Sequence, residues 1–328
     1  HNRNGGLYKD YIAKRIGNYW ENWMGFFYGN VPFLFSTSHI YLHHRLNAGK
    51  GDPFYQWDCD RSSWTDFMFY VYRSCVGYMT GWESLKTFNR MAPTNKTMAG
   101  NFDMLRRGCI WFWIVVPSVA SCSLLAAGCS VASTLRFLLL IYLEPFLAMS
   151  FFLAFINFGL HGFIEFDAEG KHYPCVNSSC IIEGEDDYFG EDDHMAHHYH
   201  TAVNHRDLVA HQETQKEIWK DPVASVFKKL SILELGLFVL LKEWKRLATL
   251  HFVDSSGKLS VDEIADLLKV RAERVEMSYE EYEFEYLPRL HSKAQQLVDE
   301  GKCVSVDQGL KVLAHSNILL EHNSSKTD

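Results

Sequence analysis

The chain has 328 residues, of which 47% are hydrophobic and 15% aromatic, and its formal net charge is −8. This composition can bury a large core, but charged and apolar residues are segregated along the sequence, which favours a membrane protein over a soluble one. The sequence begins with His and shows no signal peptide, so we expect a piece of a longer chain whose net charge says little about its partners.

The first apolar segment covers residues 24–42 and also contains glycine, asparagine and serine. Pro32 is expected to bend or end a helix there, because proline lacks a backbone donor and clashes with the preceding turn. The polar content leaves two alternatives open. The segment is either a re-entrant or partly buried helix, or a full crossing of the membrane.

Two longer apolar runs follow, at residues 108–135 and 137–164. The first contains no charged residue, and the second is interrupted by the carboxylate of Glu144. Since about 20 apolar residues cross the hydrocarbon core of a bilayer, each run predicts a transmembrane helix. Turn residues such as Gly128 and Ser130 lie near the end of the run at 108–135 and predict a tight helical hairpin.

The composition changes after Gln212. Residues 222–241 are mostly apolar with a few charges and predict an amphipathic, interfacial helix. The chain then becomes charged and helix-forming, and residues 252–263 resemble an EF-hand loop with Phe252 where the first calcium ligand should stand, which favours a packing role. We therefore predict an all-α, polytopic membrane helical bundle with a cytosolic histidine-box metal site and a C-terminal helical extension. Its parts are a membrane catalytic domain (1–212), an amphipathic interfacial helix (213–242) and a soluble helical region (243–328).

Most of the 16 histidines fall into a few clusters that are far apart in the sequence. On an α-helix, residues three and four apart share a face, so His194, His197 and His198 should project together. The same spacing relates His39 to His43. Neutral imidazoles in such sets are ligands for transition metals. The candidate metal ligands are His1, His39, His43, His44, His161, His194, His197 and His198.

The membrane topology agrees with one shared site. Both predicted transmembrane helices lie between His44 and His161, so an even number of crossings returns the clusters to the same side of the membrane. Positive charges are frequent before the hairpin, whereas its turn contains none before Arg136. By the positive-inside rule the site faces the cytoplasm. The expected location is the endoplasmic reticulum in a eukaryote or the inner membrane in a bacterium.

The histidine clusters resemble the boxes of the membrane di-iron superfamily of fatty acid desaturases, hydroxylases and alkane monooxygenases. The stretches "HIYLHHRLNAGKGDP", "NFGLHGF" and "DHMAHHYH" are most similar to those of alkane 1-monooxygenase and xylene monooxygenase, with Asp52, Pro53 and Asn157 also matching. The resemblance covers about residues 1–212 and assigns His1 to a further, severed box. It implies that the candidate histidines hold two iron ions and that O2 is a co-substrate.

The resemblance also implies a function in lipid metabolism, which is hydroxylation of an alkane or a fatty acyl chain. The chain has no GxGxxG turn and no CxxC pair, so electrons should come from a separate rubredoxin, ferredoxin or cytochrome b5. No nucleic acid partner is expected. Two alternatives stay open: a fatty acyl desaturase, and a non-catalytic metal-binding membrane protein.

Carboxylates commonly orient metal-bound imidazoles through the second ring nitrogen. The acidic residues near the histidine boxes are therefore candidates for this role. They are Asp52, Glu165, Asp167, Asp192 and Asp193, of which we favour Asp52, Glu165 and Asp193.

Overall fold

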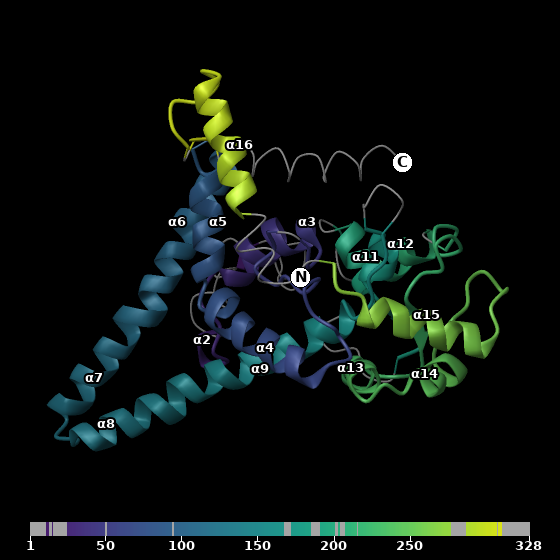
Figure 1. The fold of residues 1–328 in the computed structure, drawn as a ribbon. Helices are drawn as coiled ribbons and strands as arrows, with labels where there is room; N and C mark the ends of the chain where they lie inside the picture. The colour runs from purple at the N-terminus through teal and green to yellow at the C-terminus, as the bar shows by residue number, and fades with distance from the viewer. Residues whose placement is uncertain are drawn as a thin grey trace.

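A computed structural model shows a mostly helical molecule with a long hairpin on one side and a packed core on the other (Figure 1). The described residues are 11, 12, 15, 25–49, 51–93, 95–166, 172–184, 191–200, 203, 207–214, 216–276, 287–306, 308 and 309.

Two long helices form the predicted hairpin. Each is long and apolar enough to cross a membrane, and no other helix in the described part of the chain meets both conditions. The turn lies inside the first apolar run, where Gly128 has a φ of 85° and the Ser130 hydroxyl accepts a hydrogen bond from the Ser133 N–H. The first arm consists of α6 (Lys96–Ile110), the π-helix η5 (Trp111–Val115) and α7 (Val116–Ala126); the second consists of α8 (Val131–Phe137), the π-helix η6 (Leu138–Leu143) and α9 (Glu144–Leu160).

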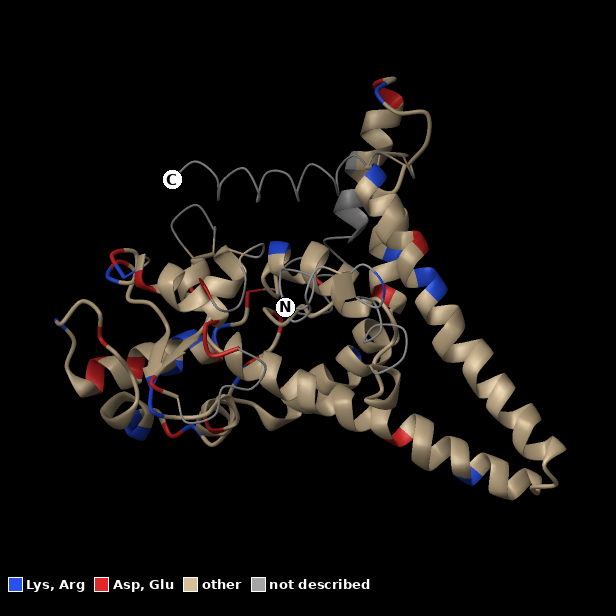
Figure 2. Ribbon diagram, turned by 180° about the vertical axis from the view of Figure 1, so that it is seen from behind, with Lys and Arg blue, Asp and Glu red and all other residues tan. Residues whose placement is uncertain are grey.

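The hairpin projects away from the rest of the molecule, and its outer half carries very little charge (Figure 2). Its side chains include many exposed large apolar residues, among them Ile114, Val119 and Leu140. Such a surface is unfavourable in water, and the polar and charged residues are concentrated in the other half of the molecule. This distribution agrees with the membrane location that the sequence predicted.

The segment at 24–42 does not form one continuous helix. It contains the short α2 (Gly25–Phe27) and, after the predicted break at Pro32, the π-helix η3 (Phe35–His43), which continues into α3 (His44–Leu46). This arrangement fits the partly buried alternative. A Cβ atom at Gly108 would overlap the Pro32 carbonyl, and one at Gly29 would overlap the backbone of Phe146. The two glycines therefore allow the segment to pass between the hairpin arms.

Three helical elements connect η3 to the hairpin. They are α4 (Trp64–Arg73), the π-helix η4 (Ser74–Met79) and α5 (Trp82–Met91). The ring of Phe67 in α4 packs against Phe158 of α9, with centroids 5.2 Å apart. The inner face of α4 therefore belongs to the same core as the second hairpin arm.

The chain after α9 contains short elements that carry the last histidine box. They are α10 (Pro174–Asn177), β1 (Cys180–Ile182), α11 (His194–Tyr199), α12 (Leu208–Thr214) and β2 (Val226–Lys228). Strands β1 and β2 pair in parallel, with Ile181 opposite Phe227. The all-α prediction is therefore wrong at this small sheet, because short runs such as "CII" give no periodicity that could distinguish a strand.

The prediction of one amphipathic interfacial helix over residues 213–242 is also wrong. Within the apolar residues 222–241, only α13 (Ile232–Leu240) is helical. This helix packs against α9, where Gly159 and Gly236 come into close contact. Leu235 and Val239 are buried in a core that also contains Leu160. An apolar segment with scattered charges can cover a protein core as well as a membrane, and here it covers the core.

The predicted boundary at residue 242 does not separate two cores. The core that contains the end of α9 also contains Leu247 of α14 (Trp244–Leu250) and Leu268 of α15 (Val261–Glu273). In the EF-hand-like loop, the Glu263 carboxylate accepts hydrogen bonds from the N–H and the hydroxyl of Ser260 and so caps α15. This carboxylate therefore stabilises the start of α15. The last described helix is α16 (Leu287–Asp299).

Candidate functional site

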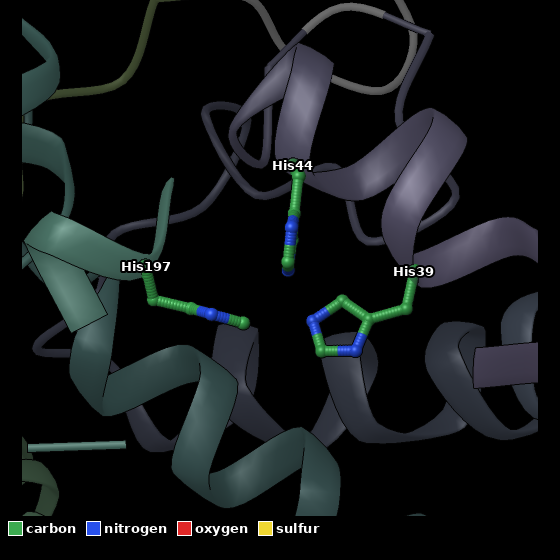
Figure 3. A group of neighbouring side chains, drawn as sticks. All are labelled: His39, His44 and His197. Carbon is green, nitrogen blue, oxygen red and sulfur yellow. The ribbon is translucent and has the colours of Figure 1, made fainter. Parts of the chain in front are cut away.

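The first group of metal-binding candidates consists of His39, His44 and His197, whose rings converge (Figure 3). One ligand nitrogen from each lies within 4.8 Å of the other two. The winding of η3 explains which histidines meet. The His44 N–H donates to the carbonyl of His39, five residues earlier, which is the hydrogen bond of a π-helix. The His44 ring therefore lies closer to His39 than the His43 ring does, with centroids 4.5 Å and 5.2 Å away.

The second group consists of His43, His161 and His198, all of which are buried. Their ring centroids are 5.0–5.1 Å apart in each pair. His161 lies at the C-terminal end of α9, and His198 comes from α11. The two groups are neighbours, since the His43 and His44 rings come from adjacent residues and the His44 and His198 ring centroids are 4.9 Å apart.

His194 is a fourth candidate ligand of the second group. Its Nδ1 lies 3.0 Å from the Glu191 carboxylate, and its Nε2 lies 2.9 Å from Nε2 of His161. The Nδ1 of His161 donates to the Asn177 carbonyl at 2.8 Å, so both facing Nε2 atoms carry lone pairs. Two lone pairs at this distance repel each other unless a cation lies between them. Nitrogen ligands about 2.0–2.1 Å from one ion and at right angles to each other are about 2.9 Å apart.

Asp52, one of the sequence candidates, holds the His43 ring by a hydrogen bond. Its carboxylate accepts a hydrogen bond from His43 Nδ1 at 2.8 Å and from the backbone N–H groups of Ala48 and Phe54, both also at 2.8 Å. The backbone hydrogen bonds hold the carboxylate in place, and the carboxylate directs Nε2 of His43 toward the other histidines of the second group. Hydrogen bonds of this kind select the tautomer and raise the basicity of a metal-binding imidazole.

A buried polar chain reaches His43 from α4. The Tyr70 hydroxyl donates to Asn157 Oδ1 at 2.7 Å, and the Asn157 amide nitrogen lies 3.2 Å from Nε2 of His43. All three side chains are buried. The chain connects the inner face of α4 with α9 and holds the asparagine against the second group.

Burial keeps the candidate ligands in their neutral form. It removes the imidazoles from water, which disfavours the charged ring, and the neighbouring imidazoles add repulsion between positive charges. Burial lowers the pKa of His197 to about 4. The pKa is also lowered for His39, His44, His161, His194 and His198. Burial alone would raise the pKa of Glu191, but the hydrogen bond to His194 and the nearby imidazoles lower it below its ordinary value.

The residues fit a transition metal. Both ring nitrogens of His44 and both of His198 are buried, and neither residue has a hydrogen-bond partner for them among the described residues. Buried polar atoms without partners are costly, and metal coordination would satisfy one nitrogen of each ring. Neutral nitrogen donors without a dominant carboxylate share suit iron, zinc, copper or nickel rather than magnesium or calcium.

The structure places the remaining sequence candidates outside the two groups. Glu165 forms an ion pair with the buried Arg271, whose Nε donates to it at 2.7 Å, so its carboxylate serves the packing of α15 rather than a histidine. The backbone carbonyl of Asp193 accepts from the N–H of His197 at the start of α11, and Asp192 is buried next to it. His1 and Asp167 lie outside the described residues.

Sequence reasoning missed three groups around the histidines: the Glu191 carboxylate and the Asn177 carbonyl, which contact them, and the Tyr70 hydroxyl, which reaches His43 through Asn157. Glu191 precedes His194 by three residues, and this spacing was a usable signal because it favours contact within one turn. The other two reach the site only through tertiary folding, so nothing local in the sequence marks them.

Replacing Glu191 with glutamine is expected to weaken metal binding at the second group by about 10-fold, the lower end of the effect of losing a residue that orients a ligand. The amide keeps the size of the side chain but loses the negative charge that favours the His194 tautomer. Zinc titration of the purified protein measures the change. The matched control is Glu183→Gln, because Glu183 is exposed and faces Lys229. Equal affinities in the two variants would contradict the role of Glu191.

Lowering the pH from 6.5 to about 4 is expected to destabilise the metal-free protein. In this window an unfolded chain binds a proton at His197, whose ordinary pKa is 6.5, whereas the folded protein does not until about 4. The unfolded state therefore binds more protons, and the stability of the metal-free protein falls as the pH is lowered through the window. The folded site should retain zinc at pH 6 and release it near pH 4 in equilibrium dialysis. Complete release already at pH 6 would contradict this expectation.

The two groups together form a largely buried, nitrogen-rich site, and each group could hold a metal ion. Comparison with protein-family models, with curated proteins and with solved structures finds no match for the chain.

Proposed function

We propose that the protein is a membrane-bound di-iron oxygenase that hydroxylates an alkane or a fatty acyl chain, using O2 and electrons from a separate protein. One observation carries the proposal: histidines from three segments far apart in the sequence form two adjacent groups at the base of an apolar hairpin. The resemblance of the three histidine boxes to the membrane di-iron superfamily supports iron as the metal. The excess of positive charge before the hairpin supports a site that faces the cytoplasm.

The roles of the chain's own residues follow from the geometry. Iron in both groups would supply the O2 activation that attack on an unactivated C–H bond requires. The histidines hold the ions through neutral nitrogens, and Asp52, Glu191 and the Asn177 carbonyl fix their rings. Burial of the second group keeps bulk water away from it. A lipid-like substrate would reach the site from the membrane, because the hairpin arms that flank η3 are apolar.

The position of the ligands favours an enzyme over a metal transporter. A transporter needs ligands along its path through the membrane, yet neither hairpin arm contains a histidine between Lys96–Ala126 or Val131–Leu160. His161 follows directly after the second arm. The site is therefore at the membrane surface, where a soluble electron donor can approach it.

The proposal is tested with the full chain in phosphatidylcholine nanodiscs loaded with Fe²⁺. Iron content is measured first, and the protein is then incubated with O2, reduced rubredoxin or ferredoxin, and an alkane or an acyl lipid. The products are identified by gas chromatography. Two irons per chain with an O2-dependent alcohol support the proposal, whereas an alkene product makes the protein a desaturase. Bound iron without turnover of any substrate identifies a non-catalytic metal-binding protein and overturns the proposal.

A further inference from the structure

We propose that the outer face of α4 and η4 lies in the membrane and contacts lipid acyl chains, as a third membrane-embedded element beside the two hairpin arms. The inference rests on the membrane location in the proposed function. We call this face the outer stripe. It consists of Trp64, Met68, Phe69, Tyr72 and Val76, and these side chains are 45–64% exposed.

Helical spacing places the members of the stripe on one side. Trp64, Met68, Tyr72 and Val76 follow one another at intervals of four residues, so each lies one turn above the last. The opposite side contains Phe67 and Tyr70, which are fully buried against α9. The element thus has a packed inner face toward the metal site and an exposed apolar outer face.

The charged side chains of the same element are bonded to other residues of the protein. Only Asp66 and Arg73 are charged between Trp64 and Met79. The Asp66 carboxylate accepts from the Asp60 N–H at 2.8 Å, and Arg73 pairs with Asp58 and donates to the Tyr55 carbonyl at 2.6 Å. Both side chains are therefore hydrogen-bonded within the protein, and Arg73 also has an opposite charge beside it. A helix that faces water normally carries charged and polar side chains on its outer face, and this element does not.

The stripe adjoins the exposed side of the second hairpin arm. The Trp64 ring of the stripe contacts the edge of Phe67, with centroids 6.1 Å apart, and Phe67 contacts Phe151 of α9, with centroids 6.0 Å apart. Phe151 is itself 47% exposed. From Phe151 the exposed apolar surface continues along the arm through Leu147 and Leu140. If lipid surrounds the arm, the same lipid reaches the stripe.

Length and composition indicate how deeply the element enters. Residues 64–79 span at most about 24 Å as a helix, which is shorter than the roughly 30 Å of the hydrocarbon core. Trp64 and Tyr72 are residue types that concentrate at the boundary between acyl chains and headgroups. The element is therefore a partly inserted helix rather than a complete crossing. This explains why the sequence did not indicate a transmembrane helix here.

The test is photolabelling of the unmodified protein in vesicles of phosphatidylcholine that carries a trifluoromethyl-phenyldiazirine in its acyl chain. Mass spectrometry locates the lipid adducts after illumination. We expect adducts on the outer stripe at a yield within about threefold of that on the α8 and α9 peptides. The matched controls are Val209 and Val270, which are equally exposed but lie in the water-facing half, and they should remain unlabelled.

The outcomes separate this inference from the proposed function. Labelled hairpin arms with an unlabelled outer stripe would overturn the inference and leave the membrane location intact. Labelling of the buried Phe67 and Tyr70 at the same yield as the stripe would show a loosened helix and would also overturn it. If the arms themselves were unlabelled, the membrane location and the inference would fail together.

Discussion

Replacing His197 with alanine is expected to remove metal from the first group and to abolish O2-dependent turnover, while the protein still inserts into the membrane. His197 is the only member of that group that comes from α11, and the remaining two histidines are adjacent to one another in η3 and α3. Two neighbouring imidazoles leave one side of the ion without a protein ligand. Iron content per chain and product formation, both measured in nanodiscs, give the result.

His200→Ala is the matched control for this variant. His200 follows α11 and contacts His211, with ring centroids 4.6 Å apart, and it belongs to neither group of ligands. We expect full iron content and at least half of the activity in this variant. Retained iron and activity in the His197 variant would contradict the assignment of the first group as a metal site.

Replacing Asp52 with asparagine is expected to weaken metal binding at the second group by about 10- to 100-fold. The carboxylate accepts three hydrogen bonds, from His43 and from two backbone N–H groups, and one oxygen receives two of them. An amide has only one oxygen and cannot accept all three, so the loop that carries the carboxylate and the His43 tautomer are both disturbed. Zinc titration measures the affinity, and thermal unfolding measures the stability.

The control for Asp52 is Asp60→Asn. Asp60 also closes a turn by accepting from a backbone N–H and a hydroxyl, both of Ser62, but it contacts none of the grouped histidines. This substitution should lower the unfolding temperature without changing the zinc affinity. An equal loss of affinity in both variants would mean that Asp52 acts only through the stability of the fold.

The sequence predicted the hairpin and the set of histidines, because both depend on local composition. A long run without charge is typical of a membrane helix, and the turn residues mark its bend. Helical spacing did not predict how the histidines divide between the two groups. An α-helix puts His39 and His43 on one face, whereas the π-helix η3 brings the ring of His44 to 4.5 Å from His39, closer than the 5.2 Å of His43.

The same local reasoning failed for residues 213–242. The apolar content of α13 was recognised, but a sequence alone does not state whether an apolar face meets lipid or the protein's own core. The decisive contact is the close approach of Gly159 and Gly236, two residues on different helices. Conversely, the apolar outer face of α4 and η4 was not recognised from the sequence. The element contains two charged residues, and only the fold shows that both are hydrogen-bonded to other parts of the protein.

The distribution of ligands between the two groups links the loading of one ion to that of the other. The His39 to His44 segment supplies ligands to both groups, and so does α11, which gives His197 to one and His198 to the other. The first ion to bind therefore immobilises both segments. The second ion then binds with a smaller loss of conformational entropy. Loading should thus be cooperative, with a Hill coefficient above 1 in a zinc titration, and singly occupied protein should be scarce.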